Sequence, residues 1–137
     1  MRRANKVGIP VVAARLVVVA WLATMMAALA PVAAGAQTAA YDQKLGRLAE
    51  VLGSIHYLRN LCTEPSNQWR DEMEQLLSVE KPEPLRRAQL IAAFNKGYRS
   101  FDSVYTRCTD QARSSADRYV EEGRTLALDL ASTYGAQ

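Results

Sequence analysis

The sequence contains few of the side chains on which enzymes and metal sites depend. Its 137 residues include one histidine, His56, and two cysteines, Cys62 and Cys108, which stand 46 positions apart. A metal site needs several ligands at matched spacing, and a thiol–disulfide enzyme normally carries C-x-x-C. Both patterns are absent, and the sequence marks no nucleophile or acid as a partner of His56. We therefore predict a protein that is not an enzyme and that holds no cofactor or metal.

Strand patterns and internal repeats are also missing after residue 36. Apolar residues instead recur at steps of three and four, which is the period of a helix. The 101 residues from Gln37 to the end suffice for one domain with a modest core and not for two. We therefore predict a single all-α domain over residues 37–137.

The first 36 residues differ in composition from the rest of the chain. A basic start, MRRANK, precedes Arg15, and fifteen uncharged residues follow it, LVVVAWLATMMAALA. Small residues stand at Ala34 and Ala36, the two positions that a signal peptidase reads. We interpret residues 1–36 as a secretory signal peptide cleaved between Ala36 and Gln37, which predicts export to the periplasm.

An uncleaved membrane anchor is the alternative, because residues 16–34 are just long enough to span a bilayer. Pro31 and the small residues around it favour cleavage, after which we expect no membrane association. Cleavage also removes four of the 17 basic residues and no acidic one, so 13 basic and 14 acidic residues give a formal charge of −1 in place of +3. Because nucleic-acid binding needs a basic surface, we expect no nucleic-acid partner.

Three helices are predicted from the apolar periodicity. The first covers residues 41–62 and ends at TEPSN, residues 63–67. A shorter second helix covers residues 67–79, and KPEP at 81–84 separates it from the third. Each break therefore combines proline with polar residues that favour turns.

The third helix is predicted to be long. No proline follows Pro84, and from Phe94 to Tyr134 apolar or small residues recur in eleven steps over forty residues. That period of about 3.6 residues matches a straight α-helix. We expect one helix of nearly fifty residues or two collinear pieces with a bend at RSSAD, residues 113–117. Either form gives a small bundle of three helices.

Cys62 and Cys108 are predicted to form one disulfide, since an even pair of cysteines in an exported domain is typically bridged. Both lie on the apolar stripes of their helices, which favours pairing. A plain three-helix bundle would carry Cys108 past Cys62, however, because the second helix is much shorter than the segment from Pro84 to Cys108. Three solutions are open. The second helix lies obliquely with an intramolecular bond, which we favour, or the third helix bends, or the bond joins two chains.

Several segments together resemble a known family. They are RLAEVLGSIHYLRNLC at 47–62, Trp69, the LL of 76–77, Glu80, Pro82, FNKGYRSF at 94–101, and Tyr105 with Cys108-Thr109. In order and spacing this set resembles a family of small exported proteins, mostly from alphaproteobacteria, that has no assigned function. The resemblance implies a signal peptide and a helical exported domain. It implies no catalytic or binding residue.

Four residues are candidates for a contact with a ligand or partner: Arg59, Trp69, Tyr98 and Tyr105. A helical wheel places Arg59 within the apolar arc of its helix, so its cation must be paired or reach solvent. It either pairs with an acid, for which Asp102 is a candidate, or binds a carboxylate or phosphate through its bidentate guanidinium. The aromatic residues either form core or line a pocket.

The stretch GSIHYLRNLC, residues 53–62, gathers suggestive side chains without placing them on one face. On the wheel Cys62 points inward, His56 lies at the boundary of the apolar face, and Tyr57 turns outward. The stretch therefore predicts no catalytic cluster.

The function that this sequence favours is a non-enzymatic interaction or envelope-support module. Its partner would be an unidentified envelope protein, and the domain would act as a monomer or a homodimer. The alternative is a small-ligand carrier whose pocket is lined by the aromatic stripe and Arg59.

Overall fold

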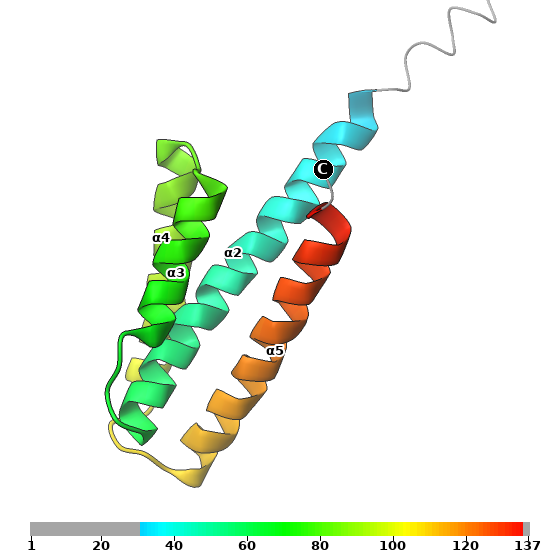
Figure 1. Cartoon of the computed structure of the whole chain (residues 1–137). Coiled ribbons are helices and arrows are strands. Elements are labelled where there is room, and N and C mark those ends of the chain that lie inside the picture. The colour runs from blue at the N-terminus through cyan, green and yellow to red at the C-terminus, as the bar shows by residue number, and fades with distance from the viewer. Residues whose placement is uncertain (1–30, 136–137) are drawn as a thin grey trace, which may run out of the picture. The chain divides into compact units, whose positions relative to one another are not determined.

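The computed structural model describes residues 31–135, and the packing reported below is that of one compact unit, Thr38–Gln137. The described residues form four helices, α2 (Pro31–Cys62), α3 (Gln68–Glu80), α4 (Pro84–Asp102) and α5 (Asp110–Tyr134), and contain no strand. In Figure 1, α2 lies between α5 on one side and the pair α3 and α4 on the other. The predicted all-α class is confirmed. Residues 1–30 of the predicted signal peptide lie outside the described residues.

The predicted third helix is in fact two helices, so the prediction of a three-helix bundle was wrong. α4 ends at Asp102, the chain turns through residues 103–109, and α5 runs back along α2 (Figure 1). Thr109 is the N-cap of α5, because its hydroxyl oxygen accepts a hydrogen bond from the Ala112 amide at 3.1 Å. The bend predicted at residues 113–117 falls inside α5, which is unbroken there.

The apolar stripe concealed this turn because its period continues across it. Phe101 before the turn, Tyr105 within it, and Ala112 and Ala116 after it pack into one cluster at the disulfide end. A stripe of constant period therefore belongs to two antiparallel helices that both face α2. The turn also removes the conflict in helix lengths, since it returns the chain to the level of Cys62.

The middle of α2 is buried on every side. All eight residues from Val51 to Leu58 are buried, including the polar Ser54 and His56. A surface helix normally buries a single stripe, whereas three other helices surround this one. The core forms two clusters along α2. One comprises Leu45, Leu48, Ala49, Leu52, Met73, Leu77, Leu90, Phe94 and Leu130, and the other Tyr57, Leu58, Ala112 and Ala116.

α2 and α4 approach so closely that two positions admit only glycine. A Cβ built on Gly53 would lie 1.9 Å from the carbonyl oxygen of Phe94, and one built on Gly97 would lie 1.9 Å from that of Glu50. Since backbone atoms cannot move aside as a side chain can, a methyl group at either position would force the two helices apart.

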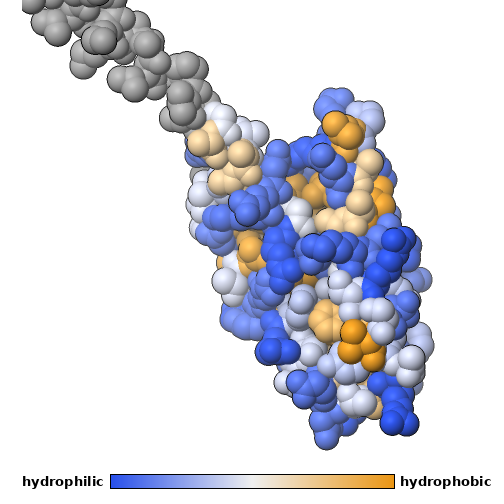
Figure 2. Space-filling model, turned by 180° about the vertical axis from the view of Figure 1, so that it is seen from behind, coloured by the Kyte–Doolittle hydropathy of each residue, from blue (hydrophilic) through white to orange (hydrophobic). Residues whose placement is uncertain are grey.

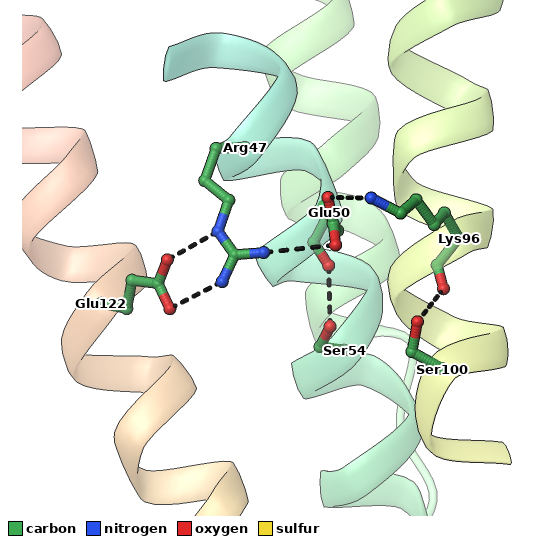
Figure 3. Close-up of polar contacts among 6 residues, drawn as sticks. All are labelled: Arg47, Glu50, Ser54, Lys96, Ser100 and Glu122. Atoms are coloured by element: carbon green, nitrogen blue, oxygen red, sulfur yellow. Dashed lines mark hydrogen bonds and ion pairs between the residues drawn. The ribbon is translucent and has the colours of Figure 1, made fainter. Parts of the chain in front are cut away.

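Charged side chains join three helices along one flank of α2 (Figure 3). The Arg47 guanidinium donates to both carboxylate oxygens of Glu122 in α5, at 2.7 and 3.0 Å, and its Nη1 lies 3.2 Å from Glu50 Oε1. The other Glu50 oxygen accepts a hydrogen bond from Lys96 Nζ of α4 at 3.1 Å. The hydrogen bond to Glu122 raises the pKa of Arg47 above its ordinary value. This network pairs its charges internally, so it ties α4 and α5 to α2.

The exposed apolar residues are unevenly distributed. Seen from behind, the surface is mostly hydrophilic, and apolar residues form small separate patches on it (Figure 2). Of the large apolar residues that are exposed in the described chain, Leu85, Ile91 and Val104 belong to α4 and the turn after it. The other two, Val79 and Leu128, belong to α3 and α5.

Candidate functional site

A groove runs between α3 and α5, with α2 as its floor. The hollow nearer the C-terminal end of α2 has a volume of about 440 Å³ and a floor of Leu48, Leu52 and Ile55. One wall comes from α3, through Trp69, Glu72, Gln75, Leu76 and Val79, and the other from α5, through Val120, Gly123, Arg124 and Ala127. Figure 1 shows α3 and α5, the helices that supply these walls, on opposite sides of α2.

A second hollow of about 370 Å³ continues the first toward the start of α2. It is lined by Tyr41, Leu45, Leu48, Leu76, Glu80, Ala127, Leu130, Ala131, Tyr134 and Gly135. The two hollows share Leu48, Leu76 and Ala127, so they form one groove, called here the α3–α5 groove. From Tyr41 to Ile55 its floor covers fourteen helical steps, or roughly 21 Å at about 1.5 Å per residue.

The α3–α5 groove is apolar with few charged groups at its rim. Glu72 on α3 is exposed and has no ion pair among the described residues. Arg124 on α5 is already paired with Glu121 at 2.7 Å. Val79 is 72% exposed although it is a large apolar residue. A surface of this kind suits binding, because it offers apolar area and one free carboxylate.

The structure places the four predicted contact residues in different parts of the molecule. Trp69 lines the α3–α5 groove. Tyr98 and Tyr105 pack instead at the disulfide end. There the Tyr57 and Tyr98 rings pack in a T-shape with their centroids 5.1 Å apart, and the Tyr57 hydroxyl donates to the Tyr105 carbonyl oxygen. Tyr57 is therefore buried, and its predicted outward position was wrong.

Arg59 forms an ion pair with Asp117 of α5, with Nη2 and Oδ1 3.0 Å apart. The suggested partner Asp102 is exposed on α4 and does not contact it. Since 35% of the Arg59 side chain and 70% of the Asp117 side chain are exposed, this is a surface pair of small energetic value. Arg59 lines neither of the two hollows described above, and nor do Tyr98 and Tyr105.

His56 is buried rather than at a boundary, with 5% of its surface exposed. Its ring lies 5.9 Å from Phe94 and 6.0 Å from Tyr98, and its Nδ1 lies 3.4 Å from the Asn60 side-chain amide. Burial, and then the charge of Arg70, lower the pKa of His56. A neutral imidazole among aromatic rings is part of the core here and does not face the groove.

The predicted disulfide between Cys62 and Cys108 is confirmed, with the two Cα atoms 4.9 Å apart. It closes within one chain, and the turn at residues 103–109 makes this possible where we had favoured an oblique second helix. Arg113 Nη1 lies 3.1 Å from the Cys108 sulfur. The sequence contained no signal for the α3–α5 groove beyond Trp69, because a groove depends on how far apart two helices lie.

Metal and membrane signatures are absent from the part of the chain that the structure describes. No group of three or more histidine, cysteine, aspartate or glutamate side chains there could hold a metal ion. Within residues 31–135, no helix combines the length and the apolar character that crossing a membrane requires.

The described part of the chain is thus an all-helical domain with one disulfide. Residues 40–134 match a family described as protein of unknown function (DUF2385), and the chain belongs to this family. No curated protein and no solved structure matches the chain. The match confirms the family of unknown function that the sequence resembles. Export and bacterial origin stay predictions.

Proposed function

We propose that this protein is an exported, non-enzymatic helical module that binds a helix of an envelope protein in the α3–α5 groove. The observation that carries this proposal is the continuity of the groove. Two apolar hollows share three lining residues and together cover roughly four turns of α2.

A helix fits this groove better than other partner segments do. The groove is walled by two helices and floored by a third, which is the surface into which an amphipathic helix lays its apolar face. Over four turns, such a helix places roughly four anchor residues on the floor of the groove. Because Glu72 has no ion pair in the described structure, we expect a basic residue at the edge of the partner's apolar stripe.

Export is supported by composition and by the disulfide. The basic start, the apolar run and the small residues before Gln37 follow the order of a signal peptide. A disulfide forms and persists in an oxidising compartment such as the periplasm. Ala36 and Gln37, the predicted cleavage positions, are exposed.

A small-ligand carrier is the second candidate, favoured by the volume of about 440 Å³ beside Trp69. Such a carrier would use the groove and not the predicted Arg59 pocket. Native mass spectrometry of the protein purified from periplasm separates the two, since a carrier retains a small molecule of constant mass.

Site-specific photocrosslinking tests the helix proposal. A photoreactive amino acid replaces Val79, which lines the groove, or Val104, a matched control that is similarly exposed (66%) but lies in the turn after α4. We expect a protein adduct from Val79 only, attached to a helical segment with a basic flank, and we expect Glu72→Lys to reduce it. Equal adducts at both positions, or none at Val79, would contradict the proposal. N-terminal sequencing of the periplasmic protein tests export, with Gln37 as the expected first residue.

A further inference from the structure

The disulfide end holds a second feature that is independent of the groove. The Cys62–Cys108 bond joins the last residue of α2 to the residue before the N-cap of α5, and both cysteines are partly exposed. From the surroundings of the two sulfurs, we propose that this bond is a directional thiol–disulfide exchange site. An external thiolate attaches to Cys62, and Cys108 leaves.

The first asymmetry is a cation at only one of the two sulfurs. The Arg113 guanidinium lies 3.1 Å from the Cys108 sulfur through Nη1, while its Nη2 lies 2.5 Å from Asp110. The Asp110 side chain is 98% exposed and the Arg113 side chain 57%. Solvent therefore screens the charge of Asp110 more strongly than the charge of the guanidinium beside the sulfur. No basic side chain of the described residues contacts the Cys62 sulfur, and Arg59, one turn earlier, is paired with Asp117.

The second asymmetry comes from the two helix ends. Cys62 stands at the C-terminal end of α2, where the helix dipole is negative and disfavours an anion. Cys108 precedes the N-terminal end of α5, where the dipole is positive and favours one. The helix ends and Arg113 therefore stabilise a thiolate at Cys108 and not at Cys62.

In exchange, the sulfur that is better stabilised as a thiolate is the better leaving group. The external thiolate attacks the Cys62 sulfur, a new S–S bond forms there, the Cys62–Cys108 bond breaks, and its electron pair leaves on Cys108. A second thiolate of the same reagent then attacks the reagent sulfur that is bonded to Cys62. Cys62 is released as a thiolate and takes up a proton. The protein gains two electrons and the reagent becomes a disulfide. The partner class is thus a protein or small molecule with two neighbouring thiols.

The wild-type protein with its bond intact tests the direction of attack. Reduced glutathione, which has a single thiol, is added under native conditions, the reaction is quenched with acid, and peptide mass spectrometry locates the adduct. We expect the glutathione adduct mainly on Cys62. An equal distribution, a preference for Cys108, or no reaction under native conditions would overturn the proposal.

Two arginine variants test the cause of the direction. Arg113→Ala should slow the release of Cys108 roughly threefold and reduce the preference for Cys62, as loss of one favourable charge implies. Arg107→Ala is the matched control, since Arg107 is adjacent to Cys108 in sequence, exposed, and makes no contact with the sulfur. Equal rates for the two variants would remove Arg113 from the proposal. High salt should diminish the difference, because 57% of the Arg113 side chain is exposed.

Discussion

The two sides of α2 are built in opposite ways. On the side toward α4, called here the closed side, Gly53 and Gly97 bring two backbones into contact, and the Arg47 network pairs the charges along its flank. On the open side, α3 and α5 leave the α3–α5 groove over α2. The comparison indicates that stability is concentrated on the closed side, whereas capacity for binding is concentrated on the open side.

Gly53→Ala should break the closed side and have the largest effect. The methyl group would overlap the Phe94 carbonyl oxygen, and we expect a loss of about 3 kcal/mol in the free energy of unfolding. Gly46→Ala in the same helix is the control. Its Cβ meets nothing within 4 Å, so it should stabilise the protein by about 0.5–1 kcal/mol through helix propensity. Urea denaturation of both variants measures the contrast, and similar effects would contradict the close approach.

The Arg47 network should contribute less. A double-mutant cycle with Arg47→Met and Glu122→Gln is expected to give a coupling energy of about 1 kcal/mol, because the pair is bidentate and only half-exposed. The same cycle on Arg124 and Glu121, a pair within α5 that is also bidentate but more exposed, should give a smaller coupling energy. If the two cycles give equal values, the network does not hold α5 to α2 more strongly than a surface pair would.

The smallest effect is the pH dependence of His56, which packs against α4. Its pKa in the folded protein is lowered from 6.5, mainly by burial and then by Arg70, with Asp71 acting in the opposite direction. The folded state therefore binds fewer protons than the unfolded state. The contribution that neutral His56 makes to the free energy of unfolding is complete above about pH 6.5 and is lost as the pH falls through the lower pKa of the folded state. Thermal melts between pH 7.5 and 5.5 should show a decrease in wild type that His56→Gln reduces, and equal slopes would exclude the effect.

Much of this fold could be predicted from local signals. Helix period, the prolines at residues 65, 82 and 84, and the even pair of cysteines led to an all-α domain, its first two breaks and its disulfide. The third break was missed because no proline or glycine marks it. Its signal is the pair Thr109 and Asp110, a capping residue followed by an acid in the first turn.

The candidate site was less predictable because it depends on tertiary placement. A helical wheel assumes that one face of a helix is buried, so it placed Tyr57 outward and His56 at an edge. Both are buried because α4 and the turn after it cover the part of α2 that carries them. Arg59 does pair with an acid, but the wheel could not identify Asp117 of α5 as its partner. The groove itself depends on the angle between α3 and α5, which no local pattern encodes.

The position of α2 also constrains the order in which the helices can assemble. The first described helix packs against the last, since Arg47 bonds Glu122 across 75 residues and Tyr41 contacts Tyr134. Such contacts between distant residues close slowly. Until α5 has packed against α2, Val51 and Ile55 lack the neighbour that Gly123 provides, so a partly folded intermediate exposes apolar surface. Chains that end before α5 should consequently aggregate or be degraded rather than persist as smaller domains.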